Sequence, residues 1–166
     1  MSDAQQFAAR LAHRQRLWPL LEGWPEAWCQ SFGKQTGYFE FELDKVEQEL
    51  GNKLPVSLRE AYRFAGRRLA KYNHPLVEPH RVFIVQNLLV FWAENQYVET
   101  WGVHTKDLKE EDPPVYVDLN GCDSELGKPS QLVWQNAKVS EFIFQMVLWD
   151  YMEWAPAPAV ARLRRG

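Results

Sequence analysis

The sequence predicts an α+β fold, in which N-terminal helices precede a central antiparallel sheet of about four to six strands and a C-terminal helix packs on that sheet. Two observations predict it. Apolar residues recur at helical spacing over 42–66 and again over 139–152. From about residue 81, short segments rich in β-branched and aromatic residues alternate with turn residues, as in an antiparallel meander.

The chain of 166 residues suits one domain or one domain with an extension. We expect three parts: a Trp-rich helical extension at 1–40, a domain at 41–153 and a Pro/Ala-rich basic tail at 154–166. Within the extension, residues 3–17 favour a helix that Pro19 ends, and 18–40 favours loops with a short helix near 25–31. Its three tryptophans are Trp18, Trp24 and Trp28.

Two amphipathic helices open the expected domain. Residues 42–50 carry Leu43, Val46 and Leu50 on one face, and Gly51 favours a C-terminal cap. Pro55 suits the first turn of the next helix, which Gly66 is expected to end.

The expected strands follow one another from residue 81. They are RVFIV, LLVFWAENQ, YVETWGVH and PPVYVDL, with LVWQ as a further edge strand. The charged loop KDLKEEDPP interrupts them. The helix at 139–152 closes the domain, with Ser140 as a candidate N-cap.

Composition excludes several functions. A net charge of −3 disfavours a nucleic-acid surface, since phosphate binding needs concentrated Lys and Arg. No apolar run is long enough for a membrane span, and the N-terminus lacks the pattern of a signal peptide, so we expect a cytoplasmic protein that binds neither nucleic acid nor membrane. The two cysteines, Cys29 and Cys122, supply neither a disulfide framework nor a four-thiolate zinc site and are expected to be free thiols.

Four blocks of the sequence resemble the SUKH superfamily, and the nearest branch is the Smi/Knr-type domain. The blocks are ELGNKLPVSLREAYRFAG, LLVFWAENQYVETWGV, DPPVYV and VSEFIFQMV, in that order. The resemblance covers roughly residues 42–150. It implies a single α+β domain that binds other proteins and has no catalytic residues.

The resemblance implies a non-enzymatic immunity protein, as for bacterial members thought to bind and neutralise toxins. Its alternative is a regulatory or scaffold protein related to the fungal regulators of cell-wall synthesis. A small hydrolase or metal-binding protein using His74, His80 or Cys122 is a third option, but the prolines around His74 and His80 exclude a helical HExxH arrangement. We therefore expect no catalytic residue, metal or cofactor, a protein partner that is a cognate toxin, and a monomer or weak homodimer.

The block FWAENQYVETWGV places three polar residues, Glu94, Asn95 and Gln96, among aromatic ones. One interpretation is structural, with the Asn and Gln amides satisfying backbone groups at a strand bend. The other is a contact with a partner. Tyr97 follows where the resemblance leads us to expect glycine, so either its backbone is ordinary β or Asn95 takes the special conformation.

The remaining candidate contacts are aromatic or acidic. An acidic patch in the charged loop would complement a basic toxin. Tryptophans outside the shared domain could carry partner specificity. Beyond Glu94, Asn95, Gln96 and Tyr97, the candidates are Trp101, Glu110, Glu111, Asp112, Trp24 and Trp28.

Overall fold

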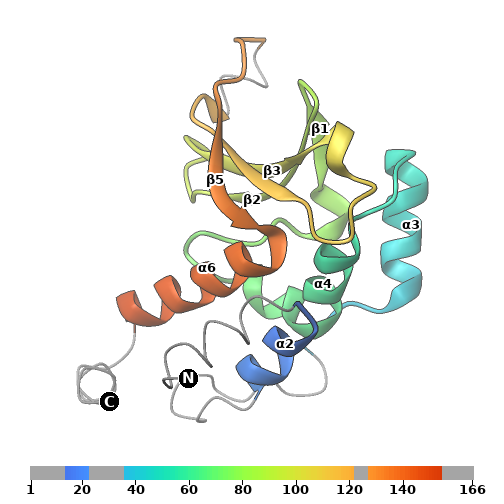
Figure 1. Cartoon of the computed structure of the whole chain (residues 1–166), viewed down its shortest axis with the longest axis vertical. Helices are drawn as coiled ribbons and strands as arrows, with labels where there is room; N and C mark the ends of the chain where they lie inside the picture. Colours follow the sequence, from blue (N-terminus) through green and yellow to red (C-terminus); the bar gives the residue numbers. More distant parts are fainter. Residues whose placement is uncertain (1–13, 23–35, 122–126, 155–166) are drawn as a thin grey trace, which may run out of the picture.

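The computed structural model describes residues 14–22, 36–121 and 127–154 and confirms the α+β fold. Figure 1 shows α2, α4 and α6 gathered below the sheet, with α3 at the far side of the body from the end of α6. The helices are α2 (Arg14–Glu22), α3 (Glu40–Leu50), α4 (Val56–Leu69), η1 (Pro79–Arg81), η2 (Thr105–Asp107) and α6 (Val139–Trp154). The strands are β1 (Phe83–Val85), β2 (Leu88–Ala93), β3 (Thr100–His104), β4 (Pro114–Asp118) and β5 (Leu132–Lys138).

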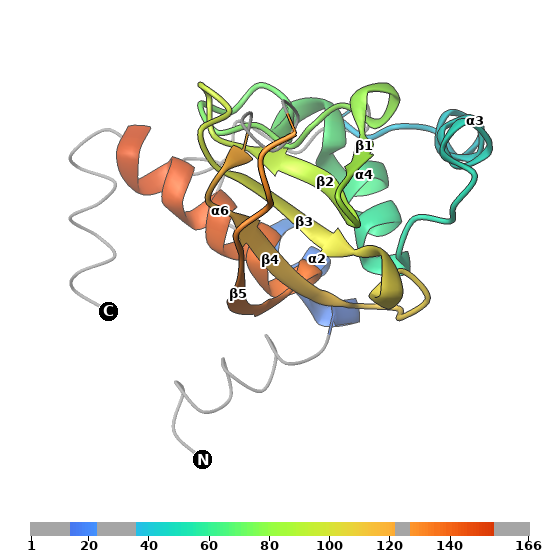
Figure 2. The same ribbon diagram turned by 90° about the horizontal axis from the view of Figure 1, so that it is seen from above.

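The five strands form one antiparallel sheet in the order β1-β2-β3-β4-β5, the expected meander. The segment LVWQ opens β5 and lies at the sheet edge, as predicted. In the view from above, the strands lie beside one another in chain order (Figure 2). Consecutive strands therefore need only local connections, which is the simplest outcome for a chain of short strands.

The core lies between the middle strands and α6. Every residue of β2 is buried, so this strand is covered on both faces. The ring of Phe142 on α6 packs against the rings of Phe91, Trp92 and Trp101, with centroid separations of 5.7 to 5.9 Å. This aromatic contact joins the C-terminal helix to the sheet.

Two helix ends test the glycine predictions. Gly51 caps α3 with φ 65°, as expected for a glycine C-cap. The prediction that Gly66 ends α4 is wrong, because the helix kinks at Ala65 (φ −149°) and continues to Leu69. A side chain at Gly66 would meet Tyr38 Cδ2 at 2.7 Å, so this glycine permits close packing instead of a helix end.

Pro19 does not end the first helix, because α2 continues through it to Glu22. Leu17 and Leu21 on this helix are each 1% exposed and belong to the same core as the sheet. The free energy gained by burying these two leucines exceeds the cost of the backbone hydrogen bond that Pro19 cannot make. Leu17 and Leu21 of α2 thus belong to the core. The boundary at residue 40 stays a prediction, and the helix expected near 25–31 lies outside the described residues.

Candidate functional site

The block around Glu94 forms the loop between β2 and β3. The Glu94 carboxylate accepts hydrogen bonds from the backbone amides of Gln96 at 2.8 Å and Val98 at 3.4 Å. The amide of Glu94 donates to the carbonyl of Glu99 at 3.0 Å. The structural interpretation of this block fits the geometry. The side chain that satisfies the backbone amides of the bend is the Glu94 carboxylate, where the prediction named the Asn and Gln amides.

Asn95 has a different contact. Its Nδ2 donates to Asn73 Oδ1 at 3.3 Å, which links the loop to the segment after α4. The two side chains are exposed. Asn95 therefore ties two neighbouring loops together at the surface.

Tyr97 itself has left-handed backbone, with φ 58°. Both expectations for this position are wrong, because Tyr97 is not in ordinary β and Asn95 has no positive φ. The loop is crowded here, since a Cβ on Gly121 would lie 2.3 Å from the carbonyl oxygen of Tyr97. The backbone of Tyr97 thus packs closely against Gly121, which follows β4. Tyr97 takes a left-handed conformation that glycine would adopt at a lower steric cost.

Trp101 is a core residue. Its side chain is buried, and its Nε1 donates to Gln135 Oε1 on β5 at 3.0 Å. A buried, hydrogen-bonded indole is not available to a partner, so Trp101 does not enter the candidate surface.

Two of the three acidic candidates in the charged loop have internal partners. Glu111 accepts from Arg14 Nη1 at 3.1 Å, and Arg14 Nε lies 2.9 Å from Glu60. Asp112 accepts from the amide and the hydroxyl of Ser140 at the start of α6. The prediction that Ser140 caps the helix is wrong, because Ser140 lies inside α6 and donates both hydrogen bonds. The Asp112 carboxylate caps the start of α6 instead. Glu110 is exposed in the same loop.

The remaining candidates are two tryptophans, the two cysteines and two histidines. Trp24, Trp28 and both cysteines lie outside the described residues. His80 lies 3.7 Å from Glu78, and the ring of His74 packs against Trp149. Within residues 14–22, 36–121 and 127–154, no group of three His, Cys, Asp or Glu side chains is placed to hold a metal ion.

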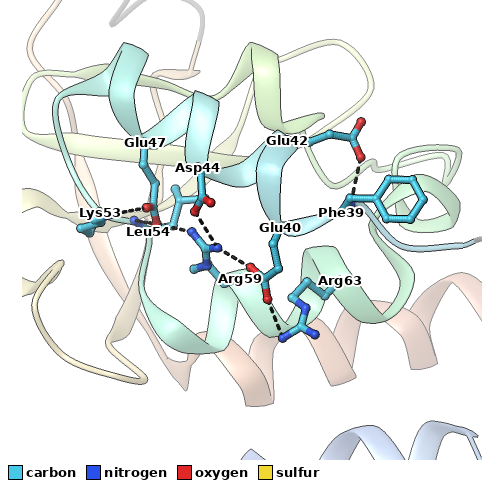
Figure 3. Close-up of polar contacts among 9 residues, drawn as sticks. All are labelled: Phe39, Glu40, Glu42, Asp44, Glu47, Lys53, Leu54, Arg59 and Arg63. Carbon is cyan, nitrogen blue, oxygen red and sulfur yellow. Dashed lines mark hydrogen bonds and ion pairs between the residues drawn. The ribbon is translucent and has the colours of Figure 1, made fainter.

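An exposed aromatic pair stands out on α3. Phe39 precedes the helix and Phe41 lies in its first turn, with rings stacked at 5.7 Å and 11°. Their exposed fractions are 65% and 70%. Phe39 points away from the polar network of the helix in Figure 3. Large exposed aromatic side chains that lie side by side are typical of interaction surfaces.

The sequence contains a signal for this pair. Leu43 and Val46 are buried on one face of α3, Leu50 is partly buried at the same spacing, and Phe41 does not share that spacing. At 100° per residue it lies on the opposite side of the helix. The predicted helix covers 42–50, whereas α3 begins at Glu40 and includes Phe41.

A polar network fixes α3 on α4 (Figure 3). Arg59 on α4 pairs with three carboxylates of α3, at 2.8 Å for Glu47 and 3.0 Å for Asp44, with Glu40 as the third. Glu47 is buried and also accepts from Lys53 at 2.6 Å and from the amide of Leu54 at 3.0 Å. The short loop after α3 is thereby fastened to the helix.

The network lowers the pKa of Glu47. Burial alone would raise this pKa, but the hydrogen bonds from Lys53, Arg59 and the Leu54 amide outweigh it. Burial would lower the pKa of the Arg59 guanidinium, but its hydrogen bonds to Glu47, Glu40 and Asp44 outweigh burial and raise that pKa. Glu47 and Arg59 therefore both stay charged. Glu47 is therefore a structural anion with its oxygen atoms already engaged.

A groove with a volume of about 340 Å³ runs beside Phe41, between α3 and η1. Tyr38 and Glu42 line this groove. Arg67 lies over the Tyr38 ring, 4.3 Å from its centre, and pairs with Glu42 at 2.7 Å. The lining residues are Tyr38, Phe41, Glu42, Lys45, Val46, Glu49, Pro79 and His80. We call Phe39, Phe41, Asp44 and this groove the α3 face.

Comparisons of the chain with family models, with curated proteins and with solved structures find no match. Among the helices of the described ranges, none combines the length and the apolar character that a membrane crossing requires.

Proposed function

We propose that this chain is a non-enzymatic, cytosolic protein-binding domain of the SUKH type, acting as an immunity protein that binds and neutralises a cognate toxin. The four-block sequence resemblance supports the family and the role. The observation that supports protein binding most directly is the exposed, stacked pair of Phe39 and Phe41 beside a groove. Such a pair offers a partner apolar area at little conformational cost.

The geometry of the other candidates supports the same function. Glu94, Glu111 and Asp112 use their carboxylates for internal hydrogen bonds or ion pairs. A general acid or base needs a carboxyl group or imidazole that reaches a reacting atom within a pocket. The α3 face instead presents aromatic rings and a shallow groove, which suit binding.

Co-expression with the toxin encoded by the adjacent gene tests this function. The full chain is expected to restore growth of cells that make the toxin and to copurify with it. Phe41→Ala is expected to weaken the complex at least about ten-fold, as the loss of an interface anchor does. Trp134→Ala is the matched control, because Trp134 is an aromatic residue that is 59% exposed on β5, away from α3.

Failure of the wild-type chain to bind or protect would refute the immunity role. Copurification with proteins of envelope synthesis, without protection from the toxin, would favour the regulatory or scaffold alternative. Equal binding by the wild type, Phe41→Ala and Trp134→Ala would leave protein binding intact but remove the α3 face from it.

A further inference from the structure

We propose that Arg67 of α4 is a positioning residue for partner binding, which holds Phe39 and Phe41 in the orientation that the partner recognises. This inference rests on the proposed protein-binding function and names a residue that acts on the α3 face without contacting the partner. We call residues 36–42, which carry both phenylalanines, the anchor segment.

The two phenylalanine rings depend on the backbone beneath them for their orientation. Phe39 and Phe41 are 65% and 70% exposed, so burial contributes little to holding either ring in place. An interface anchor that is already held in its bound conformation binds more tightly, because less conformational entropy is lost on association. Whatever fixes the anchor segment in the free protein therefore contributes to affinity.

Arg67 contacts the anchor segment at both of its ends. Its Nε donates to the carbonyl of Gly37 at 3.2 Å, and its guanidinium carbon lies 4.3 Å from the centre of the Tyr38 ring. Its Nη2 donates to both carboxylate oxygens of Glu42, at 2.7 and 2.8 Å. Tyr38 and Glu42 also line the groove, so the same side chain fixes the groove and the aromatic pair.

The kink in α4 brings the anchor segment close to Arg67. The helix kinks at Ala65, and the amide of Arg67 donates outside the helix to the carbonyl of Thr36 at 2.8 Å. A Cβ on Gly37 would lie 1.6 Å from the carbonyl oxygen of Arg63, so glycine is needed for this close approach. The backbone contact brings the segment to α4, and the Arg67 side chain then reaches along it.

Glu42 links Arg67 to Phe39. The Glu42 carboxylate accepts a hydrogen bond from the Phe39 amide at 2.8 Å as well as those from Arg67. The Phe39 amide and, after it, Arg67 hold the pKa of Glu42 below its ordinary value against the effect of burial, so this carboxylate is charged at neutral pH. Loss of the Arg67 side chain is therefore expected to loosen the cap that orients Phe39 and begins α3.

The free chain tests the positioning by NMR. Arg67→Gln is expected to raise the exchange rate of the Phe39 amide about three- to ten-fold and to increase the mobility of the Phe39 and Phe41 signals, because a local contact is lost. Arg63→Gln is the matched control. It removes the same charge from the same helix and an ion pair to Glu40 at 2.8 Å, but Glu40 keeps its pair with Arg59. Unchanged Phe39 exchange in Arg67→Gln would overturn the inference.

Affinity for the toxin encoded by the adjacent gene, measured by calorimetry, tests whether this order matters for binding. Arg67→Gln is expected to weaken binding about three- to ten-fold, the effect of ordering one or two side chains on association. Arg67→Lys is expected to lose less, because an ammonium group keeps the charge and one donor for Glu42. Equal losses in Arg67→Gln and Arg63→Gln would mean that only net charge matters and would contradict positioning.

A double-mutant cycle separates positioning from direct contact. In the Phe41→Ala background, Arg67→Gln is expected to weaken binding by less than about two-fold, because the anchor on which Arg67 acts is gone. The same loss in both backgrounds would show that Arg67 contacts the partner itself or acts through overall stability, and the positioning role would fail.

Failure of this inference differs from failure of the proposed function. A wild-type chain that does not bind the toxin would refute the function, and the exchange of the Phe39 amide would still decide whether Arg67 orders the anchor segment. A wild-type chain that binds through Phe41, with equal binding by Arg67→Gln, would leave the function standing and refute the positioning role alone.

Discussion

The carboxylate of Asp112 accepts two hydrogen bonds from Ser140, from its backbone amide at 3.0 Å and from its hydroxyl at 2.6 Å. Ser140 lies in the first turn of α6, where backbone amides have no partner within the helix. The negative charge also faces the positive end of the helix dipole. A loop residue twenty-eight positions earlier in the chain thus performs the capping role that local sequence assigned to Ser140.

Asp112→Ala is expected to destabilise the protein by about 1–2 kcal/mol, the usual effect of losing a helix cap. Urea unfolding at neutral pH measures this. Glu110→Ala, two residues earlier and exposed, is the control and is expected to change the free energy of unfolding by less than about 0.5 kcal/mol. Equal effects of the two variants would contradict the capping role.

Tyr97 allows a test of backbone strain. Tyr97→Ala and Tyr97→Gly both remove the ring, but only glycine adopts φ 58° without a steric penalty. Tyr97→Gly is therefore expected to be more stable than Tyr97→Ala by about 1 kcal/mol, measured by urea unfolding. At an ordinary β position the order would be reversed, because glycine loses more backbone entropy.

Glu47 makes stability depend on pH in the acid range. Its folded pKa is lowered below the ordinary value of 4.5, so its contribution is present above that pH and is lost as the pH falls through the folded pKa. Glu47→Gln is expected to cost about 1–3 kcal/mol at pH 7, because a buried network loses a charged partner. In acid unfolding measurements, this difference from wild type should shrink below pH 4.5. A difference that is constant with pH would show that the charge of Glu47 is not involved.

Leu21 tests whether α2 belongs to the fold. Leu21→Ala is expected to destabilise the chain by about 2–5 kcal/mol, as for other buried leucines. The control is Val98→Ala, at a side chain that is 54% exposed, with an expected change of less than about 0.5 kcal/mol. A single cooperative transition with a small effect of Leu21→Ala would mean that α2 adds little to the core.

The local elements were predictable because their signals are local. Leu43, Val46 and Leu50 repeat at helical spacing, and Gly51 ends that helix because left-handed backbone favours glycine. The strands from Phe83 onward alternate with turn residues, and their order in the sheet follows the chain. Periodicity and turn chemistry act between residues a few positions apart, so one sequence is enough to detect them.

The candidate site was less predictable, because burial and pairing depend on distant residues. Trp101 has the composition of an interface anchor, but α6 and Gln135 enclose it. Glu111 and Asp112 have the composition of an acidic patch, but Arg14 and Ser140 engage them. Nothing within the charged loop distinguishes these carboxylates from the exposed Glu110.

The sequence by itself determined the α+β class, the meander and the amphipathic face of α3, since each follows from spacing along the chain. Only the tertiary structure decided that α2 shares the core, that Asp112 caps α6, that Tyr97 takes the left-handed conformation and that Phe39 and Phe41 stay exposed. Each of these features depends on contacts between residues that are far apart in the sequence, and those contacts exist only in the folded chain.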